Sequence, residues 1–114
     1  NMYKSNITEV IAMEICRNMT GQTLTVALRG ELDHHAAEQT RNTIDLLINE
    51  RRPTELVLDL SGVTFMDSSG LGVVLGRYRL LSTRGGKMYI TGANRSVDRI
   101  LKMAGIYALV ERRG

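Results

Sequence analysis

The sequence predicts an α/β domain with a small mixed sheet, in which an opening hairpin precedes mostly parallel strands and the helices cover mainly one face. After an initial pair of strand patterns, helical and strand patterns alternate along the chain. This alternation is typical of right-handed crossovers between parallel strands. Asp59 stands in the middle of an apolar strand and the helices are few, which indicates that the second face of the sheet is more open.

The length and composition predict one domain. The chain has 114 residues, one proline, no internal repeat and no apolar stretch near the roughly 18 residues that a membrane-spanning helix needs. We expect residues 15–114 to form the domain and residues 1–14 to be an amino-terminal extension, either a first strand or flexible. Cys16 is the single cysteine, which with the absence of a secretory pattern favours the cytoplasm and no membrane association.

The charge of the chain argues against nucleic acid as a direct partner. Its 15 basic and 12 acidic residues give a net charge of +3 and are spread along the sequence. The four tyrosines and one phenylalanine do not alternate with basic residues as base-stacking surfaces require. We therefore expect no direct nucleic-acid binding. No cofactor is expected either. The arginines of the predicted helices are interpreted as a solvated face: Arg77, Arg79, Arg84, Arg95 and Arg99.

The first elements are two strands joined by a tight turn. Apolar residues alternate along the second strand, at 24–29, and Gly21-Gln22 separates it from a first strand at 15–20. Gly30 is expected to end this hairpin.

A helix is expected at 34–51, because apolar residues recur there at helical spacing. Asp33 is placed to cap its start, and Pro53 lies just past its end. The compact apolar run at 56–60 predicts a buried strand, from which the chain crosses 61–66 to the next helix.

The second helix begins at Asp67, whose carboxylate can accept a hydrogen bond from a free backbone N–H one turn in. Met66 before this cap and Leu71 inside the helix are the pair that forms a hydrophobic staple. Ser68 is then the first helical residue, and its hydroxyl should project into solvent because the cap does not need it. An apolar stripe continues to the stop at Gly85-Gly86.

The carboxyl-terminal part repeats the alternation. A short strand is expected at 87–91, followed by a helix that Asn94 caps and Gly105 ends. A last strand is expected at about 106–110. The predicted order is β-β-α-β-α-β-α-β.

A phosphate on Ser68 would lie close to free N–H groups at the positive end of the helix dipole, so the fold should tolerate it. It adds about −1.5 to −2 charges at neutral pH. Beside Asp67, this charge should repel a partner that docks on the uncharged form. The competing interpretation is a well-capped helix without a switching role.

The second helix contains three glycines, and each lowers helix stability by about 1 kcal/mol relative to alanine in a helix interior. Another role is therefore expected to offset this cost. The glycines are Gly70, Gly72 and Gly76. Gly72 and Gly76 lie one turn apart beside the apolar stripe. They allow a backbone to approach closely, either from this protein or from a partner.

Two motifs stand at a specific separation in this chain. One reads Gly30-Glu31-Leu32-Asp33-His34-His35, and the other reads Phe65-Met66-Asp67-Ser68-Ser69-Gly70-Leu71-Gly72-Val73-Val74-Leu75-Gly76-Arg77-Tyr78. Together they resemble the anti-sigma factor antagonists of the STAS domain family. The resemblance runs from about residue 24 to residue 110 and implies a single STAS domain.

The resemblance also implies a partner switch. In such proteins the unphosphorylated antagonist binds an anti-sigma factor that is also a serine kinase, which frees a sigma factor for transcription. The kinase phosphorylates the first serine of Asp-Ser-Ser-Gly, which is Ser68 here, and a serine phosphatase removes the phosphate. This chain would be a substrate and not an enzyme, and it would be a monomer or weak dimer. The implied partner surface consists of Glu31, Asp33, His34, Asp67, Ser69, Gly70, Leu71 and Gly72.

Other interpretations are weaker on the residues present. A metal site at His34 and His35 is disfavoured because adjacent residues point about 100° apart on a helix, and no third ligand is suitably spaced. A serine hydrolase is disfavoured because the Gly-x-Ser-x-Gly elbow is absent. Within the same family, the alternative is a STAS scaffold subunit of a stress-signalling or lipid-transport complex, and a stress-signalling scaffold would assemble into a large particle.

Overall fold

A hairpin opens the sheet. In the computed structural model, which describes residues 13–114, β1 (Met13–Thr20) and β2 (Thr23–Leu32) pair antiparallel across the turn at Gly21-Gln22. The hairpin is as predicted, but both strands are longer. β2 continues through Gly30, which has a φ of 130°, so the expectation that Gly30 ends the strand is wrong.

The amino-terminal extension expected at 1–14 overlaps the first strand. Its last two residues, Met13 and Glu14, are the first two residues of β1. Residues 1–12 lie outside the part of the chain that the structure describes.

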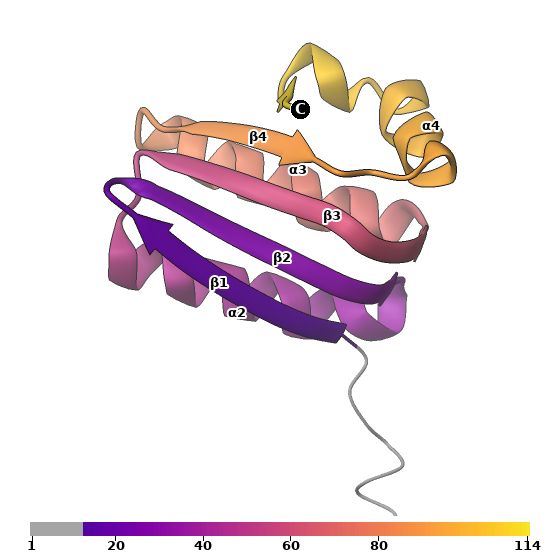
Figure 1. Ribbon diagram of the computed structural model, residues 1–114, viewed down its shortest axis with the longest axis horizontal. Helices are drawn as coiled ribbons and strands as arrows, with labels where there is room; N and C mark the ends of the chain where they lie inside the picture. Colours follow the sequence, from indigo (N-terminus) through magenta and orange to yellow (C-terminus); the bar gives the residue numbers. More distant parts are fainter. Residues whose placement is uncertain (1–12) are drawn as a thin grey trace, which may run out of the picture.

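The remaining elements alternate as the sequence predicts. In chain order they are α2 (His34–Arg51), β3 (Glu55–Met66), α3 (Ser68–Thr83), β4 (Lys87–Thr91), α4 (Arg95–Met103), the short 3-10 helix η1 (Ile106–Ala108) and β5 (Glu111–Arg112). The strands lie in the order β1-β2-β3-β4-β5, and every pair after the hairpin is parallel. This is the predicted mixed sheet (Figure 1).

β3 runs unbroken where the sequence suggested that the strand at 56–60 ends. Two register shifts between β2 and β3 absorb the irregularity of the segment that contains Gly62. A Cβ on Gly62 would lie 2.9 Å from the backbone oxygen of Leu28. The glycine therefore permits two strands to approach closely and does not end the strand.

The last strand was predicted in the wrong place. Residues 106–110 were expected to be extended, but they begin with η1 after Gly105, which has a φ of 76°. The backbone N–H groups of Leu109 and Val110 both donate to the oxygen of Ile106. Ile106 and Val110 are buried one helical turn apart, so this short apolar run follows helical spacing.

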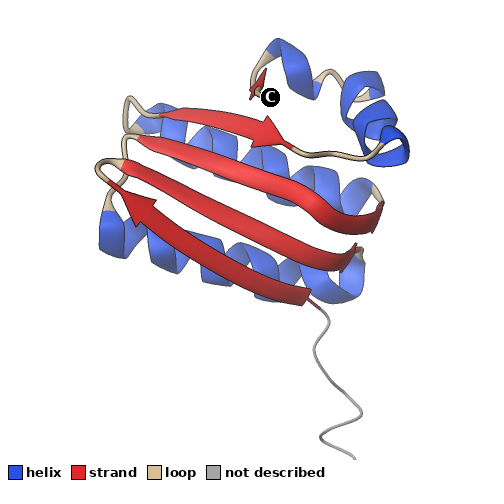
Figure 2. Cartoon of the chain, viewed as in Figure 1, coloured by secondary structure: helices blue, strands red, loops and turns tan. Residues whose placement is uncertain are grey.

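The two longer helices cover one face of the sheet, as predicted (Figure 2). α2 packs on β1 and β2, and α3 packs on β3 and β4.

Asn94 caps α4 by accepting from the N–H of Val97 at 2.8 Å, and its amide donates to the oxygen of Val63 in β3 at 3.1 Å. Asp59 is half-buried and accepts from the N–H of Ser61 at 2.9 Å. None of the described helices is long and apolar enough to cross a membrane.

Arg77 departs from the predicted solvated arginine face. Its side chain is buried between α2 and α3, with its Nε 2.7 Å from a carboxylate oxygen of Asp45 and one terminal nitrogen 3.3 Å from the oxygen of Val73. Desolvation lowers the pKa of Arg77, and the charge of Asp45 opposes that change. The ion pair joins the two helices that begin at the candidate site.

Candidate functional site

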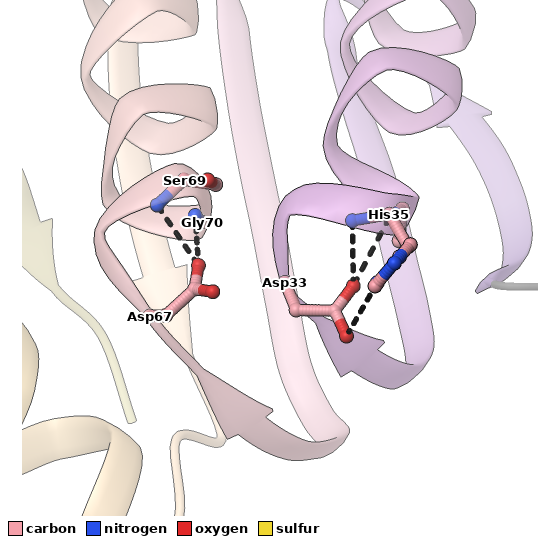
Figure 3. A network of polar contacts seen from close by, with 6 residues as sticks. Asp33, His35, Asp67, Ser69 and Gly70 are labelled. Atoms are coloured by element: carbon pink, nitrogen blue, oxygen red, sulfur yellow. Dashed lines mark hydrogen bonds and ion pairs between the residues drawn. The ribbon is translucent and has the colours of Figure 1, made fainter.

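Two helix entrances lie side by side at one end of the sheet. β2 and β3 are parallel neighbours, and their register pairs Leu32 with Met66. The next residues, Asp33 and Asp67, have extended backbones and begin α2 and α3 (Figure 3). The parallel register therefore joins the two sequence motifs into one surface.

Both aspartates are N-caps, as the sequence predicts. An oxygen of Asp67 accepts from the N–H of Ser69 at 2.9 Å and from that of Gly70 at 3.3 Å. An oxygen of Asp33 accepts from the N–H groups of His35 and Ala36 at 3.0 and 3.2 Å. Each cap satisfies backbone donors that a helix start leaves free.

The electrostatics keep Asp33 ionised. Desolvation raises the pKa of this carboxyl, but the hydrogen bonds from the backbone N–H groups of Ala36 and His35 outweigh it and hold the pKa below its ordinary value. The ring Nδ1 of His35 lies 3.7 Å from the second carboxylate oxygen. At neutral pH this end of the molecule therefore carries a fixed negative charge.

Ser68 is the first residue of α3, and it is exposed. Its hydroxyl makes no side-chain hydrogen bond to the other described residues, because Asp67 supplies the cap. Ser69, in contrast, is half-buried, and its N–H is held by that cap. Ser68 thus presents a free hydroxyl at the start of a preformed helix.

The three glycines of α3 fall into two groups. A Cβ on the buried Gly70 would lie 2.6 Å from both the oxygen of Leu32 and the Cγ of Met66, so this glycine lets the entrance of α3 sit against β2. Gly70 therefore permits the close packing that positions the start of α3 against β2. A Cβ on Gly72 or Gly76 would meet no atom within 4 Å, so packing within the described chain does not explain these two.

The other predicted surface residues differ in exposure. Glu31 and His34 are exposed, and Gly72 is exposed beyond them along α3. Leu71 is half-buried against the core that contains Met66. All the predicted residues thus gather around the two helix entrances.

Phe65 is a residue of this region that the sequence interpretation left out of the partner surface. It is 48% exposed and pairs with Glu31 across β2 and β3. The sequence signal for its exposure is strand alternation. Successive strand residues point to opposite faces, and Phe65 directly precedes the apolar residue Met66, which is buried.

His34 and His35 are both exposed. Their rings lie 4.0 Å apart at the start of α2. Within residues 13–114, no group of three potential ligands among His, Cys, Asp and Glu lies close enough to hold an ion.

The fold is a mixed five-stranded sheet that places an exposed serine, at the start of one capped helix, beside the start of a second capped helix. Residues 14–112 match the STAS domain model, and the chain belongs to this family, among its anti-sigma factor antagonists. It is 45% identical over 87 residues to the anti-sigma F factor antagonist of Paenibacillus polymyxa, which covers 76% of this chain and 74% of that protein.

Two solved structures of SpoIIAA are similar to it. The unphosphorylated form of this anti-sigma factor antagonist superposes with a TM-score of 0.76 at 31% identity, covering 89% of each chain. The phosphorylated form, described as a Bacillus cell fate determinant, gives a TM-score of 0.70 at 31% identity, covering 89% of this chain and 92% of that chain. The resemblance drawn from the two sequence motifs is confirmed.

Proposed function

We propose that this protein is a phosphorylation-controlled antagonist of an anti-sigma factor, with Ser68 as the phosphate acceptor. The unphosphorylated form binds an anti-sigma factor that is also a serine kinase, and this binding releases a sigma factor. Phosphorylation of Ser68 ends the interaction, and a serine phosphatase restores it. The protein is the substrate in both reactions, acts in the cytoplasm in the control of sporulation, and is a monomer or weak dimer.

The observation that carries this proposal is the free hydroxyl of Ser68 at the entrance of α3. Asp67 caps the helix, so the serine is not needed for the fold. The amino-terminal end of a helix carries a partial positive charge, which favours a phosphate group there. The described helix can therefore accept the modification without unfolding.

The charge around Ser68 explains how a phosphate ends binding. Asp33 and Asp67 begin neighbouring helices at the same edge of the sheet, and Glu31 is exposed close by. A phosphate adds about −1.5 to −2 charges to this acidic surface at neutral pH. A partner that fits the uncharged serine then meets an additional dianion at the centre of its contact.

The open side of α3 supports a protein partner. Gly72 and Gly76 leave the helix backbone uncovered by side chains, and nothing in the described chain fills that space. Each glycine costs about 1 kcal/mol relative to alanine. We infer that the anti-sigma factor brings its own backbone close to α3 here, in a surface that also includes His34, Ser69 and Leu71.

Site-specific labelling tests this function. Incubation with the cognate kinase and ATP should add one phosphate, read by intact mass and mapped by peptide fragmentation to Ser68. Ser68→Ala should abolish the addition. Ser69→Ala is the matched control, since it removes the adjacent hydroxyl and should still be phosphorylated. An unchanged mass for the wild type, or a phosphate on Ser69, would show that the assignment is wrong.

A further inference from the structure

Phe65 is an exposed aromatic side chain beside the switch. Four large apolar side chains among the described residues are exposed, and they are Leu46, Phe65, Met103 and Leu109. Phe65, at 48%, is the one of these four that belongs to the strand end leading into Asp67 and Ser68. The chain has no other phenylalanine.

The topology of the sheet leaves this side chain uncovered. The last pair between β3 and β4 is Asp59 with Thr91, so β3 extends beyond β4 and its final residues pair with β2 alone. Met66 turns into the core and is 1% exposed, whereas Phe65 precedes it and remains in solvent. The fold thus leaves the phenyl ring of Phe65 exposed at the end of β3, where its burial contributes little to folding stability.

We propose that Phe65 is the aromatic anchor of the partner surface and inserts into an apolar pocket of the anti-sigma factor. This inference rests on the proposed function and adds a residue to it. The occupant is the same partner because Phe65 belongs to the strand end that leads into the switch: it pairs with Glu31 across β2 and β3 and lies three residues before Ser68 in the chain. Buried aromatic side chains at the centre of an interface commonly dominate its binding energy.

The surroundings of the ring specify the chemistry of the pocket. Glu31 and Asp67 flank Phe65 with negative charge, so the pocket is apolar at its centre and basic at its rim. A phosphate on Ser68 places charge at the edge of this apolar contact, where burying it is costly. The anchor therefore makes binding more sensitive to the modification.

Binding of the full-length variants to the cognate anti-sigma factor tests the proposal. Phe65→Ala should raise the Kd by about tenfold to a hundredfold, the effect of truncating an aromatic hot spot. Leu46→Ala is the matched control, because Leu46 is 57% exposed on α2, and it should bind as the wild type does. In kinase assays Phe65→Ala should raise KM and leave kcat nearly unchanged.

The outcomes separate this inference from the proposed function. Wild-type affinity for Phe65→Ala, or an equal loss for Leu46→Ala, would overturn the anchor while the switch stands. Absence of wild-type binding would reject the proposed function itself, and the anchor with it. If Phe65→Ala does not fold, Phe65→Gln replaces the ring with a polar chain and should show the same loss of affinity. Unfolding of both variants would assign Phe65 a structural role and overturn the proposal.

Discussion

Asp67 connects the stability of α3 with the chemistry of the residue that follows it. Its carboxylate holds the N–H groups of Ser69 and Gly70, which leaves the hydroxyl of Ser68 free. If the serine itself capped the helix, a phosphate would remove a structural hydrogen bond. Asp67 therefore stabilises the helix, and on our proposal the adjacent Ser68 carries the regulation.

Substitution of the capping residue Asp67 tests whether it stabilises α3. Asp67→Ala should lower the free energy of unfolding by about 0.5–2 kcal/mol, because the two N–H groups lose their acceptor. Asp67→Asn keeps an acceptor oxygen and should stay close to the wild type. Urea denaturation measures both values. Equal stability of the wild type and Asp67→Ala would mean that the cap contributes nothing.

Predictions for single residues were confirmed where they depend on the local sequence. They were wrong or incomplete where they depend on another strand or helix. Asp33, Asp67 and Asn94 were predicted as caps because each precedes a helical pattern, and all three accept the expected hydrogen bonds. The exposure of Phe65 depends on β4 ending early, and the burial of Arg77 depends on Asp45 in a different helix. The sequence around either residue does not contain that information.

At the scale of elements, α3 combines a tightly packed start with an open outer side. Gly70 touches β2 directly, whereas Gly72 and Gly76 face open space. The same residue type therefore serves the fold at one position and, on our proposal, a partner at the other two. Spacing along the helix does not distinguish these uses.

Alanine substitutions separate the two roles. Gly70→Ala should destabilise the protein by about 1–3 kcal/mol, because the new methyl group meets the backbone of Leu32 and something must shift. Gly72→Ala and Gly76→Ala should each stabilise it by up to about 1 kcal/mol through helix propensity. The same two variants should bind the anti-sigma factor more weakly. Thermal unfolding and titration calorimetry provide both readings, and unchanged binding would remove these glycines from the interface.

The order of elements was largely predictable, but irregular strands were not. Alternating patterns gave the hairpin, the parallel strands and the three longer helices. Gly30 was interpreted as the end of the hairpin, and the strand at 56–60 was expected to stop before Gly62, although both glycines lie within a strand at a close approach or register shift between β2 and β3. Residues 106–110 form a short apolar run whose pattern suits a strand or a helix, and Gly105 leads it into η1.

At the scale of the whole molecule, the parallel register of β2 and β3 creates the site. It places two helix entrances together, and α2 and α3 then run over the same face of the sheet with the Asp45–Arg77 ion pair between them. A switch at this position changes the charge of a rigid surface and does not need a change of fold. On our proposal, the regulated property is therefore the affinity for a partner.

The affinity of the cognate anti-sigma factor for the unphosphorylated protein and for the protein phosphorylated on Ser68 tests this claim most directly. Calorimetry on the two forms, with their melting temperatures measured in parallel, should show binding by the unphosphorylated form and a loss of at least about a hundredfold for the phosphorylated one, or about 2.7 kcal/mol. The melting temperatures should agree closely, because the start of a helix accepts negative charge. Equal affinities, or a phosphorylated form that melts far below the unphosphorylated one, would contradict the account.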